Sequence, residues 1–198
     1  MATDGLRFTE IEHKFVVGDD FDLGRFAATL DALGPSHVTA LPVEDRYFLT
    51  EDGVRRRFVV RHRFDRDLHH LTVKTLDPDA EVRVEVNLDL GHHAGDQRAQ
   101  VDAFVRQFGV RWEGGIHKDI RVWHFADVEV VYYAATNGPR SVRCVEFEAT
   151  EKPSLAHALE ALSRYERLTG FDARERTPLS LLQILCPEIE ALLGGSVA

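Results

Sequence analysis

The chain has 198 residues and a formal net charge of −9, and its 44% hydrophobic and 29% charged residues are typical of a globular protein. The acidic balance disfavours nucleic acid as a partner, because DNA- and RNA-binding domains usually carry a basic surface. No apolar stretch reaches the length of a membrane span and the N-terminus lacks a signal-peptide pattern, so we expect a cytoplasmic protein with no membrane partner.

Residues 1–198 are expected to form one domain, because the sequence contains neither an internal repeat nor a linker rich in Pro, Gly or Ser. Cys144 and Cys186 are too few and too far apart for a disulfide framework, so we interpret both as reduced packing residues. The mixture of strand and helix patterns described next predicts the α+β class with a mainly antiparallel sheet.

Seven segments are predicted as strands. Five of them alternate apolar and polar residues with a period of two, and the other two are rich in aromatic and β-branched residues. In chain order the predicted strands are 10–17, 43–49, 57–64, 70–76, 81–90, 121–133 and 141–149.

Four segments have apolar residues at helical spacing. The first begins after Asp22, a good N-cap, and ends at Gly34. The others are 101–108, 154–169 and 181–193, the last of which Pro187 interrupts. The apolar segment after Pro187 is suited either to a homodimer contact or to covering one end of the sheet.

The predicted strands have one charged and one apolar face. For a single strand this indicates only a solvent-facing side, but here the charges are sorted by strand. Two strands present carboxylates two residues apart, whereas others present mainly Arg and Lys. The charged faces hold Glu10, Glu12 and Lys14; Arg61 and Arg63; Thr72 and Lys74; Arg83, Glu85 and Asn87; and Glu146 and Glu148.

This sorting indicates a site for a hard cation and a polyanion. Mg²⁺ or Mn²⁺ prefers carboxylate oxygens, which Glu10, Glu12, Glu146 and Glu148 supply if the first and last strands are neighbours. Arg and Lys are suited to phosphate, through bidentate hydrogen bonds and point charge respectively. If the charged faces point inward, the sheet closes into a barrel around a polar tunnel, with amphipathic helices packed outside.

The same segments resemble a known family. Glu10-Ile-Glu12-His-Lys14 has the ExExK form of the triphosphate tunnel metalloenzymes, the CYTH superfamily. Asp45-Arg-Tyr47-Phe48, Val60-Arg61-His-Arg63, Leu71-Thr-Val-Lys74, Arg83-Val-Glu85, Val145-Glu146-Phe-Glu148 and Thr177-Pro-Leu-Ser-Leu-Leu resemble later motifs of that family, in the same order. The resemblance implies a closed eight-stranded antiparallel β-barrel, the tunnel, that binds a small-molecule triphosphate.

By this resemblance the chain is expected to be a metal-dependent hydrolase that uses Mg²⁺ or Mn²⁺ to cleave inorganic tripolyphosphate or an organic triphosphate such as thiamine triphosphate. The alternatives are a class IV-type adenylate cyclase and a catalytically weak polyphosphate-binding module. The resemblance assigns metal to Glu10, Glu12, Glu146 and Glu148, catalysis to Tyr47, Lys74 and Glu85, and phosphate to Lys14, Arg61, Arg63, Lys74, Arg83, Lys118 and Arg121.

Three positions depart from the family pattern. Asn87 stands where a second acidic residue is frequent, and Tyr133 stands where an aspartate is usual, with Glu129 four positions earlier. Lys118 and Arg121 are three residues apart instead of two, which places them on opposite faces of a regular strand unless a bulge intervenes. The number of metal ions, and which of these two cations faces the tunnel, are therefore left open.

Overall fold

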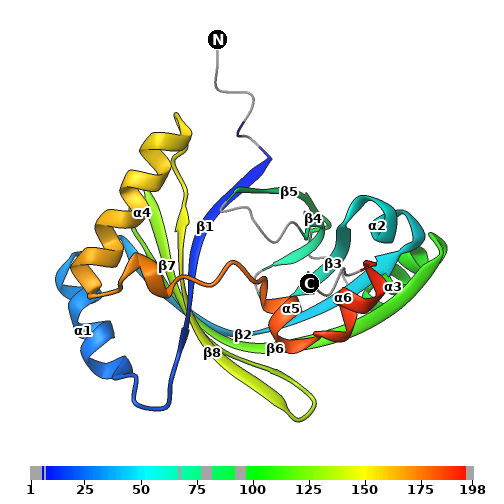
Figure 1. The fold of residues 1–198 in the computed structure, drawn as a ribbon, viewed down its shortest axis with the longest axis horizontal. Coiled ribbons are helices and arrows are strands. Elements are labelled where there is room, and N and C mark those ends of the chain that lie inside the picture. The colour runs from blue at the N-terminus through cyan, green and yellow to red at the C-terminus, as the bar shows by residue number, and fades with distance from the viewer. Residues whose placement is uncertain (1–5, 7, 67, 77–81, 92–96, 195–198) are drawn as a thin grey trace.

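The computed structural model describes residues 6, 8–66, 68–76, 82–91 and 97–194. Eight antiparallel strands close into a barrel in the order β1-β5-β4-β3-β2-β6-β7-β8, with helices outside it (Figure 1). The predicted α+β barrel is confirmed. The strands are β1 (Thr9–Val17), β2 (His37–Thr50), β3 (Phe58–Phe64), β4 (His69–Thr75), β5 (Val82–Asp89), β6 (Val110–His124), β7 (Val128–Asn137) and β8 (Arg140–Ala149).

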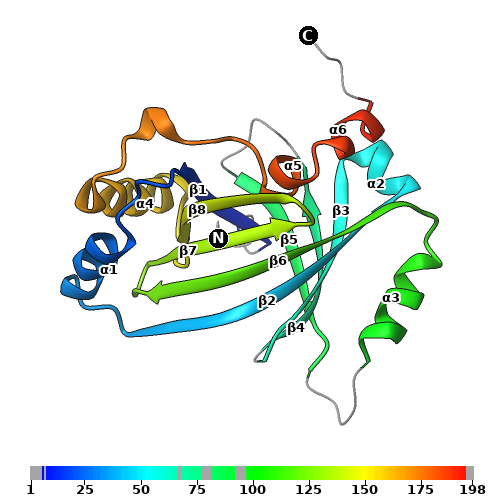
Figure 2. The ribbon, with the colours of Figure 1, turned by 90° about the horizontal axis from the view of Figure 1, so that it is seen from below.

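The helices gather at two sides of the barrel. Figure 2 shows α1 and α4 together at one side and α2, α3, α5 and α6 at the other. Among the described residues no helix is long and apolar enough to cross a membrane. The helices are α1 (Leu23–Ala32), α2 (Glu51–Arg56), α3 (Arg98–Arg106), α4 (Leu155–Thr169), α5 (Leu181–Leu185) and α6 (Glu188–Leu192), with a 3₁₀ turn at Ala173–Glu175.

Strand β1 closes the barrel by pairing with two neighbours. Its first residues pair with β5, and the rest, from Glu12 to Val17, pairs with β8. The apolar face of β1 and β8 is buried under α1 and α4, where Phe15 and Phe147 pack with Leu30 and Leu162 in one cluster. Burying each of these side chains contributes about 1.5–3 kcal/mol, so this packing fixes which face of β1 points inward.

A second apolar cluster closes one end of the barrel. Leu182 and Leu185 of α5 pack there with Ile189 of α6, against Ile116 of β6 and Tyr133 of β7. Pro187 separates the two short helices, as predicted. Within the chain, the segment after Pro187 therefore covers one end of the barrel, which is one of the two roles expected for it.

One predicted element is wrong and one element was not predicted. Residues 121–133 are not one strand: the N–H of Phe125 bonds to the carbonyl of Val128 at 3.0 Å in a turn that separates β6 from β7. This turn contains no Gly, Pro or Asn, and Asp127 is its only residue of a type typical of turns, so the sequence signal is weak. Helix α2 was not predicted, because six residues are too few for a helical pattern. Glu81, in the range predicted for β5, lies outside the described residues.

Candidate functional site

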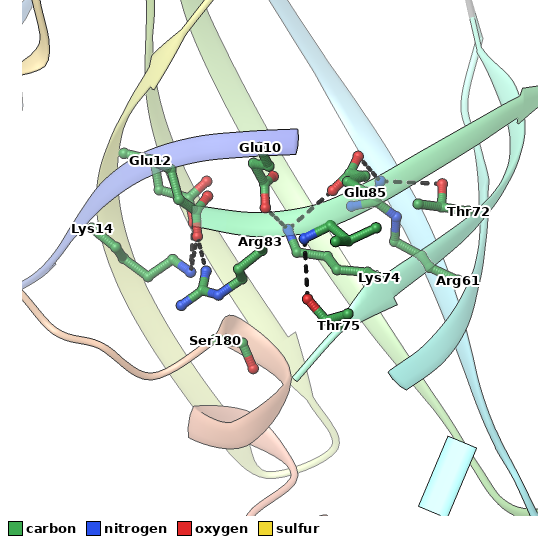
Figure 3. Close-up of polar contacts among 12 residues, drawn as sticks. Glu10, Glu12, Lys14, Arg61, Thr72, Lys74, Thr75, Arg83, Glu85 and Ser180 are labelled. Atoms are coloured by element: carbon green, nitrogen blue, oxygen red, sulfur yellow. Dashed lines mark hydrogen bonds and ion pairs between the residues drawn. The ribbon is translucent and has the colours of Figure 1, made fainter. Parts of the chain in front are cut away.

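The charged faces of the strands point into the barrel, around a cavity of about 420 Å³. Figure 3 shows part of this interior, where side chains from β1, β3, β4 and β5 point toward one another. The ionisable residues that line the cavity are Glu10, Glu12, Lys14, Tyr47, Arg61, Arg63, Asp65, Lys74, Glu85, Lys118, His124, Glu129, Tyr133, Glu146 and Glu148.

One wall of the cavity is acidic. Glu12, Glu148 and Glu129 are cross-strand partners on the adjacent strands β1, β8 and β7, so three carboxylates lie in a row. In the next row Glu146 pairs with Lys14, whose Nζ is 3.1 Å from its Oε1. Strand order places this wall away from β3 and β4.

The opposite wall is basic and is organised by Asp45, which is fully buried. Arg63 donates two hydrogen bonds to its carboxylate, at 2.7 and 2.8 Å, and Lys118 Nζ lies 2.6 Å from Oδ2. These cations hold the pKa of Asp45 well below its usual range, although burial alone raises it. Asp45 therefore stays ionised and fixes two phosphate-binding candidates.

Arg61, Lys74 and Glu85 form the junction between the walls (Figure 3). Arg61 donates to Glu85 Oε1 at 3.0 Å, and Lys74 Nζ lies 3.2 Å from Glu85 Oε2. Lys74 also forms an ion pair with Glu10. Burial works against a charged Glu85, but Lys74 and Arg61 lower its pKa, so it is a carboxylate at neutral pH.

Arg83 and Lys14 neutralise Glu12. Lys14 donates to its Oε1 at 3.1 Å, and Arg83 bonds to the same oxygen (Figure 3). Arg83 also donates to the carbonyl of Pro178 at 2.8 Å, which ties the barrel to the segment leading into α5. Although burial favours the neutral acid, Lys14, Lys74 and Arg83 lower the pKa of Glu12.

Two other carboxyls are much less well neutralised. Burial and the charge of Glu12 raise the pKa of Glu10 to about 7, in spite of Lys74. Burial and the carboxylates of Glu10 and Glu12 raise the pKa of Glu148 well above its usual range. Among the described residues no cationic side chain forms an ion pair with Glu148. The acidic wall thus holds more carboxyl groups than its own cations keep ionised.

Within the described part of the chain, no group of three or more His, Cys, Asp or Glu side chains is arranged as a metal site. In the free protein many of the carboxylate oxygens already form ion pairs with Lys and Arg side chains. The donor chemistry nevertheless matches a hard divalent cation, because such ions prefer carboxylate oxygens. Glu10, Glu12 and Glu148 are buried close together, and their mutual repulsion helps to raise the pKa of Glu10 and Glu148. A cation placed among them would relieve that repulsion.

The structure separates the two cations left open by the sequence. Lys118 lines the cavity and is buried, whereas Arg121 lies on the outer face with its guanidinium over the ring of Trp123, at 4.6 Å from the centroid. Burial and the neighbouring Arg63 lower the pKa of Lys118 to about 8. Two predicted phosphate-binding residues are therefore not among those that line the cavity: Arg121, on the outer face, and Arg83, which is buried and bonded to Glu12 and the Pro178 carbonyl.

At two of the three departures from the family motifs, Asn87 and Tyr133, a neutral side chain donates a hydrogen bond to a neighbouring carboxylate. Asn87 donates to Glu85 Oε1 at 3.0 Å, and Tyr133 donates to Glu146 Oε1 at 2.7 Å. Tyr47, expected to take part in catalysis, donates to Asp45 Oδ2 at 3.3 Å, and burial raises its pKa, so it remains a neutral donor.

Sequence reasoning missed three contributors to the site. Asp45 was noticed only as part of a motif and Glu129 only as a distant substitute for an aspartate. His124 was not considered; its Nδ1 lies 2.9 Å from Glu129 Oε1 and its Nε2 lies 3.1 Å from Thr39 Oγ1. The period of two within β7 places Glu129 on the same face as Tyr133, and this was the available signal.

A family model described as the CYTH domain matches residues 9–172. No curated protein sequence matches the chain. Among solved structures, a Pyrococcus horikoshii protein is 16% identical with a TM-score of 0.69, over 89% of this chain and 99% of that one. A Pyrococcus furiosus protein is 23% identical with a TM-score of 0.66, over the same shares.

A Bacillus halodurans protein provisionally assigned as an adenylate cyclase is 16% identical, with a TM-score of 0.56 over 89% of this chain and 97% of that one. At these identities the three structures support the fold and do not extend to activity.

Proposed function

The chain belongs to the CYTH domain family, and from this premise we propose that it binds the triphosphate group of a small molecule inside the barrel and hydrolyses a phosphoanhydride bond with Mg²⁺ or Mn²⁺. The substrate is inorganic tripolyphosphate or an organic triphosphate. The observation that carries this proposal is the pair of walls, one with a row of three carboxylates and the other with Arg63 and Lys118, with Arg61 and Lys74 at the junction between them.

Charge balance favours a divalent cation together with the polyanion. Acidic side chains outnumber Lys and Arg in the cavity lining given above. A bare triphosphate with about four negative charges would therefore meet no net positive charge in the cavity, although the basic wall is suited to it. A divalent ion held by Glu10, Glu12, Glu146 and Glu148 would offset charge on both the protein and the phosphates.

The basic residues have distinct proposed roles. Arg61 and Arg63 present planar guanidinium groups that can bind phosphate oxygens in pairs, whereas Lys74 and Lys118 act as point charges. Asp45 positions two of these four, Arg63 and Lys118, before any ligand arrives. Such prior positioning lowers the entropic cost of binding and orients the reacting phosphate.

Glu85 is proposed to orient the attacking water by accepting a hydrogen bond from it. It stays ionised beside Arg61 and Lys74, and Asn87 holds one of its oxygens. The water oxygen forms a bond to one phosphorus while the P–O bond to the leaving phosphate breaks, and the proton that the water loses passes to solvent. Arg61 and Lys74 stabilise the charge that develops on the leaving oxygen. A bound divalent ion would add Lewis-acid polarisation of the phosphate oxygens.

The experiment is an incubation of the full chain with Mg²⁺ or Mn²⁺ and, separately, tripolyphosphate, thiamine triphosphate and ATP. Orthophosphate and cyclic AMP are then measured. The proposal expects orthophosphate with at least one substrate and its loss on adding EDTA. Cyclic AMP from ATP would establish the cyclase alternative. Tight tripolyphosphate binding with neither product would establish a binding module and contradict the proposal.

A further inference from the structure

The outer face of β4 and β5, with the adjoining part of β3, is apolar. Three of its side chains lie in one cross-strand row, Val60, Val73 and Val86, and Leu71 pairs with Leu88 in the next row. Val73, Val84 and Val86 are 40–48% exposed and Leu88 is 59% exposed. We call Val60, Leu71, Val73, Val84, Val86 and Leu88 the β4–β5 face.

The amphipathic helices pack outside the barrel as expected, but among the described residues they do not cover this face. The helices of the described chain contact mainly β1, β2, β3 and β8, and none of them packs extensively on β4 or β5. Soluble monomers rarely leave an apolar patch of several hundred Å² in water, and such patches usually mark an interaction surface.

We propose that the β4–β5 face packs against the same face of a second copy of this chain, forming a twofold homodimer. This inference goes beyond the proposed function and does not depend on it. The exposed fractions correspond to apolar area on the order of 400 Å². A stable dimer buries roughly 800 Å² per partner, of which about 65% is apolar, so the face supplies most of the apolar area required.

The charge pattern favours a second copy over other occupants. The outward positions of the described parts of β4 and β5 carry no Asp, Glu, Lys or Arg. The face can therefore meet its own copy without like-charge repulsion, even though each chain has a net charge of −9. An anionic membrane would be repelled by that net charge and would find no basic residues on the face.

The side chains of the face suit the same arrangement. Two sheets pack face to face about 10 Å apart when their side chains interdigitate, and β-branched side chains on a pleated surface do this well. In an isologous dimer both copies use the same surface patch. If one residue contacts a second residue of the partner, the same contact occurs with the two copies exchanged, so one small patch is used twice. The row of Val60, Val73 and Val86 lies at the centre of this patch.

The test measures the mass of the full chain in solution by light scattering, at tens of micromolar protein. The wild type is expected at twice its 22.4 kDa monomer mass. Val86→Glu places a charge at the centre of the face and is expected to give monomer. The matched control is Phe104→Glu, because Phe104 is 60% exposed on α3, outside the face, and this variant is expected to remain dimeric.

A second measurement covers the case in which Val86→Glu does not fold. Leu88→Cys is treated with a bismaleimide linker, and Phe104→Cys is the control; Cys144 and Cys186 are buried and reduced, so they do not compete. Linked dimer is expected only for Leu88→Cys. A monomeric wild type, an unchanged dimer in folded Val86→Glu, or binding of monomer to vesicles of phosphatidylcholine and phosphatidylserine would each overturn the proposal.

Discussion

Glu12 and Glu148 are direct partners across the β1–β8 ladder, and both line the barrel interior. Glu12 has two cations bonded to one oxygen, from Lys14 and Arg83. Glu148 has no ion pair among the described residues, and burial together with Glu10 and Glu12 raises its pKa well above the ordinary range. The two carboxyls therefore differ in charge state in the free protein.

The first prediction concerns Glu148→Gln. At neutral pH the Glu148 carboxyl is ionised in the unfolded chain and must take up a proton to be buried beside Glu10 and Glu12, which costs free energy. The amide avoids that cost, so we expect the free energy of unfolding of the metal-free protein to rise by about 0.5–2 kcal/mol. The same change removes a proposed metal ligand, so turnover should fall at least ~100-fold. Thermal denaturation in EDTA and orthophosphate release measure the two effects.

Glu151→Gln is the matched control, because it makes the same charge change at an exposed position outside the barrel. It should alter neither property. A Glu148→Gln protein that is destabilised and fully active would contradict both halves of the prediction.

The second prediction is a pH dependence governed by Glu10. Its pKa is about 7 in the folded protein against an ordinary 4.5. Below about pH 4.5 the carboxyl is protonated in both states and contributes nothing to their difference. As pH rises toward 7 the unfolded state ionises first, so the contribution of Glu10 to the free energy of unfolding falls, and above about 7 the full penalty remains.

A divalent cation should offset that penalty. We therefore expect Mn²⁺ to raise the Tm more at pH 8 than at pH 5, as measured by thermal denaturation with and without the ion. In Glu10→Gln the Mn²⁺-dependent difference between the two pH values should shrink. An equal Tm increase at both pH values in the wild type would count against a cation at the acidic wall.

The third prediction compares Lys118 with Arg121. The pKa of Lys118 is about 8, so a polyanion that binds beside it should raise this pKa and draw a proton from solution near pH 8.5. Calorimetry of tripolyphosphate binding without metal, in buffers of different ionisation enthalpy, measures that uptake. Lys118→Ala should bind more weakly and take up less proton.

Arg121→Ala should bind tripolyphosphate as the wild type does, because Arg121 lies over Trp123 on the outer face. Weaker binding in Arg121→Ala than in Lys118→Ala would mean that β6 presents its other face to the cavity.

The interior residues were predictable because side-chain direction in a strand follows a period of two that the sequence displays directly. Glu10, Glu12 and Lys14 needed only that rule to be placed on one face of β1. Arg121 was misplaced in the phosphate set because a family motif with shorter spacing was carried over to it. The period of two, applied without the motif, separates it from Lys118 as the structure does.

Relationships between strands were not available from the sequence. The row of Glu12, Glu148 and Glu129 depends on the register of β7 against β8 and of β8 against β1, which no local pattern encodes. The same limit applies to the β4–β5 face, since apolar outward positions predict a covering layer but do not say which element supplies it. Tertiary packing decides both.

The final prediction concerns Arg61, which is 7% exposed and donates to Glu85 and Thr72. In Arg61→Ala, Glu85 keeps Lys74 and Asn87 as partners, so the fold should survive. Loss of a charge-assisted hydrogen bond of about 1.5–3 kcal/mol to phosphate should weaken tripolyphosphate binding roughly 10- to 150-fold. Arg61→Lys keeps the charge without the planar fork and should recover only part of that affinity.

The control for Arg61 is Arg111→Ala, because Arg111 is a mainly exposed cation outside the barrel, 3.5 Å from Glu51. It should leave binding unchanged, since exposed ion pairs contribute little. Steady-state kinetics then separates two roles for Arg61: an increase confined to KM indicates ground-state phosphate binding, whereas an added decrease in kcat indicates stabilisation of the leaving phosphate. Equal losses in Arg61→Ala and Arg111→Ala would show that only overall charge, and not the position of Arg61 beside Glu85, governs binding.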